Sequence, residues 1–275
     1  MSQSNQSNDE VRRKLLKPKP TSEQVTDAIQ KTFSCSQVSI IKELESYDDC
    51  NYCVQVDGTK YLAKVYNGVE SASYIRTSAT DYSGEKLSSI HLYLDIFQHL
   101  NQKQYGIVTS LPFCPSTIPS PVSIHELPVT SQEHSPAPLA LLLLTWVEGS
   151  TMSSAKTLPI ESLADAGRYL GNVCLALDDL TNQNPDACRT ADRYHAWDGK
   201  NTLDLQDFVH CIQDERRRKL VQNVLDSFRE QLVECDDKPD FRKGILQADF
   251  NDANIIMNSE GKVSGVIDFG DTTLR

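Results

Sequence analysis

The stretch that most constrains the fold is residues 244–271, where four carboxylates and two asparagines surround two short apolar runs. The runs, at 255–257 and 263–267, flank a polar segment with turn residues at 258–262. β-branched runs joined by such a segment are typical of a β-hairpin. The sequence therefore predicts a hairpin whose open end carries the polar side chains.

The spacing of this hairpin predicts a site for a hard cation. If Met257 pairs with Gly265, Asn254 faces Asp268, and directly opposed residues have Cβ atoms about 4.5–5.5 Å apart. An amide oxygen and a carboxylate would then point into one space, which suits Mg²⁺. Asp249, in the loop entering the first strand, is expected to reach that space without binding the metal. Asp- and Asn-rich loops also serve ordinary turn chemistry, but the second strand, which ends in Asp268, favours the metal site.

Two motifs in this stretch resemble those of aminoglycoside phosphotransferase-like kinases. Residues 247–254 are similar to the family's catalytic loop, H-G-D-x-x-x-x-N, and residues 267–271 to its I-D-F/W metal motif. The similarity extends over residues 20–271, with its motifs in family order, and is greatest to the hydroxylysine kinase branch. The other matching segments are 46–52, 61–65, 144–149 and 195–197.

The resemblance implies a two-lobed, protein-kinase-like α+β fold: a small antiparallel β lobe and a mainly helical lobe, incomplete at the C-terminus. It implies in-line phosphoryl transfer, in which positioning and charge neutralisation carry the rate. Asp249 would take the proton of the acceptor hydroxyl, Asn254 and Asp268 would hold Mg²⁺, and Lys64 would grip the phosphates. The remaining implied site residues are Asp48, Asp49 and Asn51 for the nucleotide, with Gln247 and Asp271 in support. The implied donor is GTP or ATP, and the implied acceptor is 5-hydroxy-L-lysine.

The rest of the chain suggests two lobes behind a disordered tail. Residues 1–20 are polar and basic and are predicted to be disordered. Residues 21–146 would form the nucleotide-binding lobe, with a proline-rich loop at 111–138, and residues 147–275 the catalytic lobe. In the first lobe we expect a capping-box helix from Thr21, a turn at Asp57-Gly58, a helix over 88–100 and a strand over 139–147. In the second lobe, one helical face would comprise Ile160, Leu163, Ala164, Gly167, Leu170, Cys174 and Leu177.

Several departures from the family pattern leave the activity open. Gln247 and Ala248 stand where the family has His and Gly, and His91 stands where a Glu should pair with Lys64; Glu85 lies nearly two turns earlier. The chain ends soon after Asp271, whereas the family continues with helices, so we expect exposed apolar surface. A small-molecule kinase, or a descendant of one, and a non-catalytic nucleotide-binding protein both stay open. A phosphate-monoester hydrolase is a more distant alternative.

Composition narrows the cellular setting. The net charge of −11 argues against a nucleic-acid partner. The opening residues lack a secretory signal, and the longest apolar run, 139–144, is too short to span a bilayer. Eight cysteines include one C-x-x-C, Cys50 and Cys53, without a second pair for zinc. We therefore expect free thiols, a cytoplasmic location and a small-molecule hydroxyl acceptor as partner, with neither nucleic acid nor membrane.

Overall fold

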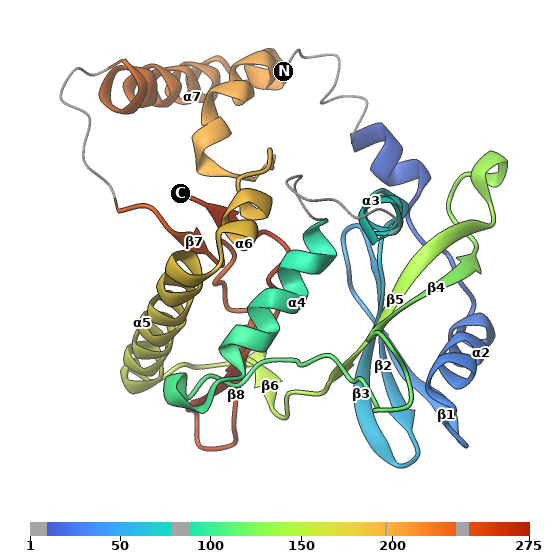
Figure 1. Cartoon of the computed structure of the whole chain (residues 1–275). Helices are drawn as coiled ribbons and strands as arrows, with labels where there is room; N and C mark the ends of the chain where they lie inside the picture. The colour runs from blue at the N-terminus through green and yellow to red at the C-terminus, as the bar shows by residue number, and fades with distance from the viewer. Residues whose placement is uncertain (1–9, 79–87, 196, 235–241) are drawn as a thin grey trace.

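The computed structural model describes residues 10–78, 88–195, 197–234 and 242–275. Its largest sheet is antiparallel, with the strand order β1-β2-β3-β5-β4 (Figure 1). These strands are β1 (Val38–Leu44), β2 (Cys50–Val56), β3 (Thr59–Val65), β4 (Val122–Leu127) and β5 (Ala137–Thr145). The predicted turn at Asp57 and Gly58 joins β2 to β3, and both residues have positive φ, 46° and 85°, as a two-residue hairpin turn requires.

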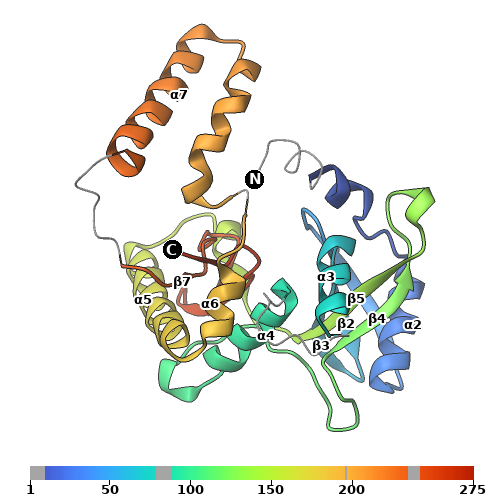
Figure 2. The ribbon, with the colours of Figure 1, turned by 45° about the horizontal axis from the view of Figure 1, so that its top comes forward.

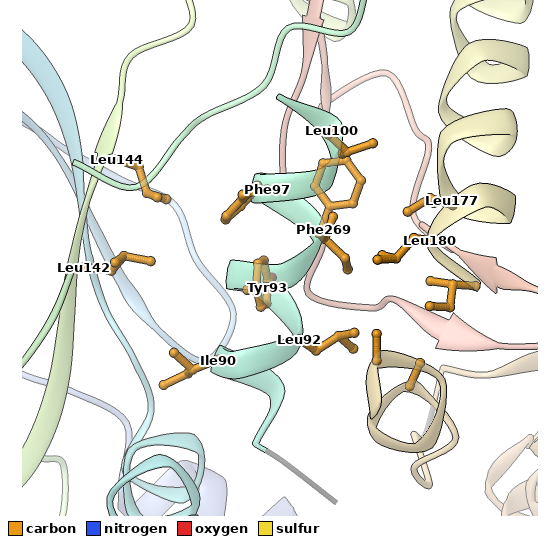
Figure 3. Packing of buried hydrophobic residues seen from close by; sticks show 14 of the residues in the cluster. Ile90, Leu92, Tyr93, Phe97, Leu100, Leu142, Leu144, Leu177, Leu180 and Phe269 are labelled. Carbon is orange, nitrogen blue, oxygen red and sulfur yellow. The ribbon is translucent and has the colours of Figure 1, made fainter. Parts of the chain in front are cut away.

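Strand β5 is buried on both faces, which explains its unbroken apolar sequence. Leu139, Leu141 and Leu143 pack with helix α2 (Ser22–Phe33) on one side of the sheet. Leu142 and Leu144 face the other side, toward helix α4 (Ser89–Leu100), as Figure 3 shows. Because successive residues of β5 are buried on opposite faces of the sheet, the sequence of this strand is continuously apolar.

The helical part of the molecule lies beyond α4. Its elements are α5 (Ile160–Gln183), α6 (Pro185–Ala191), η4 (Gly199–Cys211), α7 (Glu215–Phe228) and the π-helical η5 (Arg229–Val233). Helix α4 lies between the sheet and α5, so one hydrophobic cluster joins the two halves of the molecule (Figures 1 and 3). Helix α7 and the preceding η4 project away from the rest of the chain (Figure 2).

Short strands complete the fold around the predicted hairpin. β8 (Ile255–Met257) and β9 (Val263–Val266) pair antiparallel, and β6 (Ser150–Thr151) joins β8. β7 (Ile245–Leu246) pairs with β10 (Thr273–Leu274). Short 3₁₀ turns are η1 (Lys103–Tyr105), η2 (Gln132–His134) and η3 (Met152–Ser154). None of the described helices combines the length and apolar character needed to cross a membrane.

Several sequence predictions are confirmed by the structure. Thr21 forms a full capping box with Gln24 at the start of α2. The proline-rich segment 111–138 frames a single strand, β4, before β5 begins. The predicted helix over 88–100 is α4, with Ser88 as its N-cap. Helix α3 (Gly68–Ser78), directly after β3, was not predicted.

The prediction of a disordered tail is wrong for residues 10–20. Residues 10–15 are helical, and Pro18 and Pro20 are buried. Backbone hydrogen bonds tie this segment to the rest of the molecule, among them those from Lys19 N to Pro128 O at 2.8 Å and from Gly68 N to Leu16 O at 3.1 Å. Polar composition indicates disorder only when a segment finds no tertiary partners, and here the basic side chains meet acidic groups described below.

The predicted buried face of α5 is also mostly wrong. Ile160 is 76% exposed and Leu163 53% exposed, and of that set only Leu177 is fully buried. The helix instead packs through a set of small and apolar residues that shares only Leu177 with the predicted face: Ser162, Ala166, Val173, Ala176, Leu177 and Leu180. Helix α5 is apolar on two sides, and periodicity alone cannot say which side meets the core. Helix α5 therefore carries exposed apolar side chains, among them Ile160, Leu163 and Leu175.

Three predictions about the fold are left without a test. Glu85 and residues 1–9 of the predicted tail lie outside the described residues. The boundary between the lobes at residues 146 and 147 stays a prediction, because β5 and α5 contribute to one shared core.

Candidate active site

The predicted hairpin is present, but its register is shifted by one residue. Ile256, not Met257, pairs with Gly265, and Ile255 pairs with Val266. Asn254 consequently faces Ile267, whose amide donates to the Asn254 carbonyl at 2.9 Å. The predicted direct opposition of Asn254 and Asp268 is therefore wrong.

The turn at the end of the hairpin explains this shift. The Asn258 side chain accepts from the amides of Glu260 and Lys262, and Gly261 takes a positive φ of 74°. This turn sets Met257 against Val263, and an irregularity follows between Ile256 and Met257. Loop geometry fixes hairpin register, and counting apolar residues could not reveal this bulge.

Asp249 is held firmly at the entry to the first hairpin strand. Its Oδ1 accepts from Asn251 Nδ2 at 2.6 Å, and its Oδ2 accepts from Asn254 Nδ2 at 2.7 Å. Both bonds use amide nitrogens, so each stabilises the charged carboxylate and fixes its direction. The Asn254 side-chain oxygen accepts no hydrogen bond from the part of the chain that the structure describes.

Gln247 connects the two polar motifs. This buried side chain accepts from Asp249 N at 2.9 Å and donates from Nε2 to Asp268 O at 2.6 Å. Gln247 therefore keeps the loop intact at the position where the family pattern has His. Its amide supplies one acceptor and one donor in the required directions.

Ala248 carries backbone strain, and we expect Ala248→Gly to stabilise the protein. Ala248 has a positive φ of 63°, a left-handed conformation that costs a residue with a Cβ about 1–2 kcal/mol. Glycine removes that cost but gains freedom in the unfolded chain, so the net gain should be about 1 kcal/mol. Urea unfolding would measure it as a higher midpoint at unchanged slope. The control is Ala253→Gly, an exposed residue of the same loop without positive φ, which should not stabilise; equal effects of the two changes would contradict the strain.

Asp268 and Asp271 lie beyond the second hairpin strand. Asp268 has a positive φ of 58°, and its Oδ1 accepts from Tyr93 Oη at 3.2 Å and from Gly270 N at 3.0 Å. Burial, followed by the charges of Asp249 and Asp268, raises the pKa of Asp271 above its ordinary value. The three carboxylates thus share one region of negative potential.

A half-buried basic side chain, that of Arg193, braces this segment from the helical side. Arg193 donates to Thr272 O at 3.0 Å and to Gly270 O at 2.8 Å. His195 Nε2 lies 3.3 Å from Asp271 Oδ1. Burial, and then Arg193 and other cations, lower the pKa of His195 to about 4, so the imidazole is neutral at pH 7. The contact between His195 and Asp271 is therefore polar, and it is not an ion pair.

Lys64 projects from β3 toward the same region. Its side chain is almost fully buried, and Nζ lies 2.8 Å from Asp49 Oδ2. The ammonium group also lies over the rings of Tyr66 and Tyr93, 5.2 and 5.8 Å from their centroids. Burial by itself would lower the pKa of Lys64, but Asp49, followed by Tyr93 and Asp268, raises it well above the usual value, so the group is charged.

Helix α4 does not supply the partner of Lys64 at the position where the family pattern places a Glu. His91 instead stacks on Tyr74, with ring centroids 4.7 Å apart, and bonds Ser88 Oγ through Nδ1 at 2.8 Å. Asp49, predicted as a nucleotide-binding residue, is the carboxylate that pairs with Lys64. The loop before β2 therefore supplies the carboxylate that the family pattern places on a helix.

Asn67 organises this loop. The residue is fully buried; its backbone amide donates to Asp49 Oδ1 at 2.8 Å, and its Nδ2 donates to Arg13 O at 2.9 Å and Asp48 O at 3.3 Å. Asn51, predicted to bind nucleotide, lies opposite Lys64 on β2, and its Oδ1 is buried without a partner among the described residues. Sequence reasoning missed Asn67. The available signal was the pair Asn67-Gly68 directly after an apolar strand, because Asn and Gly are typical of turns.

The N-terminal segment holds the same loop from outside. Arg13 pairs with Asp48 at 2.6 Å and also with Glu70. Lys17 Nζ donates to the carbonyl oxygens of Ser46 and Tyr47, at 2.9 and 2.6 Å. The segment predicted to be a tail therefore supports the loop that carries Asp48 and Asp49.

Glu70 provides a pH-dependent contribution to stability that Glu70→Gln should remove. Burial, only partly offset by Arg13, raises the pKa of Glu70 from 4.5 to about 7. The folded state then binds more protons than the unfolded chain, so the free energy of unfolding falls as pH rises from about 4.5 through about 7. Glutamine resembles the protonated form, and its stability relative to the unaltered chain should improve between about pH 5 and about pH 8.

Urea midpoints across this pH range would measure the effect. Glu126→Gln, an exposed change on β4, is the control and should show a constant difference from the unaltered chain. A constant difference for Glu70→Gln as well would contradict the raised pKa.

The donor atoms at this site are compatible with Mg²⁺. Among the described residues, no three His, Cys, Asp or Glu side chains gather as a metal centre. Mg²⁺ does not need such a cage, since it usually binds one or two carboxylates together with waters and substrate phosphates. Asp268 offers a carboxylate with one oxygen already oriented, and Asn254 offers an amide oxygen; both are hard ligands.

Comparisons with known proteins place the chain in a family. Residues 41–275 match the Phosphotransferase enzyme family (APH), and the chain belongs to this family. Among solved structures, wild-type aminoglycoside 2'-phosphotransferase-IIIa in complex with GDP is similar, with a TM-score of 0.58 at 13% identity over 93% of this chain and 74% of that chain. The aminoglycoside phosphotransferase APH(4)-Ia has a TM-score of 0.52 at 15% identity, over 93% of this chain and 73% of that chain. The predicted kinase-like α+β fold is thereby confirmed.

Curated relatives carry a more specific name. Hydroxylysine kinase of Danio rerio is 25% identical over 94% of this chain and 67% of its own length. Hydroxylysine kinase of Mus musculus is 24% identical over 93% of this chain and 65% of its own length. The chain therefore spans about two thirds of the length of these relatives.

Proposed function

We propose that this chain is a small-molecule kinase that transfers the γ-phosphate of GTP or ATP to the hydroxyl of an amino-acid-like acceptor, 5-hydroxy-L-lysine. The observation that carries the proposal is the convergence of Lys64, from the sheet, with Asp268, from the C-terminal hairpin: the Tyr93 hydroxyl bonds Asp268 Oδ1 at 3.2 Å, and the Tyr93 ring lies 5.8 Å from Lys64 Nζ. A buried, fixed cation near an accessible, oriented carboxylate suits a nucleotide–metal complex. The likeness to hydroxylysine kinases supports the acceptor.

Each residue then has a role in transfer. Asp249, whose carboxylate is held by Asn251 and Asn254, would take the proton of the acceptor hydroxyl. Lys64 would hold the phosphates that precede the transferred group. Asn254 and Asp268 would hold Mg²⁺, which when bound neutralises phosphate charge. Asp48 and Asn51 would border the nucleotide, while Asp271 and Gln247 would support the loop.

A second candidate, a nucleotide-binding protein without turnover, has a specific observation in its favour. Ala248 has a strained backbone conformation next to Asp249. Asp49 forms an ion pair with the ammonium group of Lys64, which would otherwise be available to bind phosphate. Both functions share nucleotide binding, so only an acceptor-dependent reaction separates them. The cytoplasmic location and the small-molecule acceptor as sole partner stay predictions.

Thermal unfolding followed by an acceptor assay tests the proposal. Mg²⁺ with GTP or ATP should raise the unfolding midpoint over Mg²⁺ alone, since ligand at a hundredfold excess over Kd adds about 2.7 kcal/mol. Nucleotide consumption should then depend on 5-hydroxy-L-lysine, and L-lysine, which lacks the hydroxyl, is the matched control. A shift without consumption would favour the non-catalytic candidate, and no shift with either nucleotide would refute both.

A further inference from the structure

Tyr93 is the side chain through which helix α4 reaches the candidate site. Its hydroxyl donates to Asp268 Oδ1 at 3.2 Å, and its ring lies 5.8 Å from Lys64 Nζ. The residue is almost completely buried, between the sheet and the segment that carries Phe269 (Figure 3). One residue thus contacts both the cation from the sheet and the carboxylate from the hairpin.

The orientation of α4 makes Tyr93 its contact with these two groups. His91 is turned toward Tyr74 and Ser88, whereas Tyr93, two positions later, points to Asp268. The ring of Tyr93 is braced by Phe97 at 5.5 Å and by Tyr66 at 6.2 Å between centroids. A tyrosine fixed by aromatic neighbours presents its hydroxyl in one direction at little entropic cost.

The segment that receives this hydrogen bond is shaped to accept it. A Cβ built on Gly270 would lie 2.8 Å from Tyr93 Oη, so a residue larger than glycine would push the hydroxyl away. Gly270 N donates to the same Asp268 oxygen at 3.0 Å, and Arg193 donates to the Gly270 carbonyl at 2.8 Å. The Tyr93 hydroxyl and the Gly270 amide therefore fix Oδ1 of Asp268. Because a carboxylate is rigid and planar, its Oδ2 is oriented as well.

We propose that Tyr93 is a positioning residue, which fixes the Asp268 carboxylate through its hydroxyl so that Asp268 is preorganised for the metal-bound nucleotide. The inference rests on the proposed function, because it takes Asp268 to be a metal ligand. Partners that orient a metal ligand typically account for 10–100-fold in metal affinity. The position of α4, which shares one hydrophobic cluster with the sheet and with α5, would then set how well Mg²⁺ is held.

Tyr93→Phe tests this role, because it removes one hydroxyl and leaves the packing. Tyr66→Phe is the matched control: Tyr66 belongs to the same ring cluster over Lys64, but its buried hydroxyl has no hydrogen-bond partner among the described residues. Calorimetric titration of Mg²⁺ into the full chain with nucleotide would measure metal affinity directly. We expect Tyr93→Phe to weaken it about tenfold, and Tyr66→Phe to leave it within about twofold.

The outcomes separate a positioning role from a purely structural one. A lower unfolding midpoint without a change in Mg²⁺ affinity would mean that Tyr93 only stabilises the fold, and would overturn the inference while the proposed function stands. If Tyr93→Phe does not fold, Gly270→Ala should weaken Mg²⁺ binding in the same way, and unchanged affinity there would also overturn it. Absence of Mg²⁺-dependent nucleotide binding in the unaltered chain would refute the proposed function, and the inference with it.

Discussion

Asp249→Asn is expected to lower hydroxylysine-dependent nucleotide consumption by about a hundredfold to ten-thousandfold, the usual range for a lost general base. The carboxylate is held by two amide nitrogens, from Asn251 and Asn254, so it is positioned before substrate binds. Asparagine keeps the size and one acceptor oxygen but cannot take a proton. Steady-state rates at saturating nucleotide and acceptor would measure the loss.

A neighbouring residue supplies the control for this change. Asp252→Asn alters an exposed carboxylate of the same loop and should leave the rate unchanged. The nucleotide-induced rise in unfolding midpoint should survive in Asp249→Asn, because this residue is not expected to bind the metal. A rate within a few-fold of the unaltered chain would contradict the assignment of Asp249 as the base.

Asp268→Asn is expected to abolish the Mg²⁺-dependent part of nucleotide binding. The amide oxygen of asparagine can still accept from Tyr93 and Gly270, so the loop should fold, but the charge that attracts the cation is lost. A hundredfold excess of nucleotide over Kd is expected to add about 2.7 kcal/mol to the free energy of unfolding. The corresponding rise in the unfolding midpoint should therefore disappear.

The design of this second test distinguishes loss of metal from loss of fold. The unfolding midpoint without ligand should stay close to that of the unaltered chain, and Asp252→Asn should keep the full nucleotide shift. An undiminished shift in Asp268→Asn would show that Asp268 is not the metal ligand. A raised requirement for Mg²⁺ with retained binding at high concentration would point to Asn254 as the stronger ligand.

Lys64 is anchored by the loop before β2, and not by helix α4 as the family pattern predicted. Asp49 replaces the expected helix carboxylate, and Asn67 and Arg13 fix the loop that carries it. Breaking a buried pair by removing one partner is strongly destabilising, because it leaves an uncompensated buried charge. The N-terminal segment is therefore part of the structural support for the loop that holds Lys64 at the candidate site.

The sequence by itself determined much of the local structure. Capping at Thr21, the turn at Asp57 and Gly58, and the buried strand over 139–144 follow from side-chain hydrogen bonding, backbone preference and apolar pattern. The hairpin and its polar residues were likewise visible from 244–271, because residues close in sequence meet without help from the rest of the fold. The proposed roles of Asp249, Asn254, Asp268 and Lys64 stay predictions until they are tested.

Only the tertiary structure decided the contacts between distant segments. The hairpin register depended on a bulge after the Asn258 turn, and the buried side of α5 depended on which neighbours cover it. Three contacts join residues that are far apart in the sequence and belong to no common motif. They are the ion pair of Lys64 with Asp49, the ion pair of Arg13 with Asp48, and the hydrogen bond from Tyr93 to Asp268. Such contacts depend on how whole elements pack, and a pattern along one chain does not encode which of its polar groups will meet.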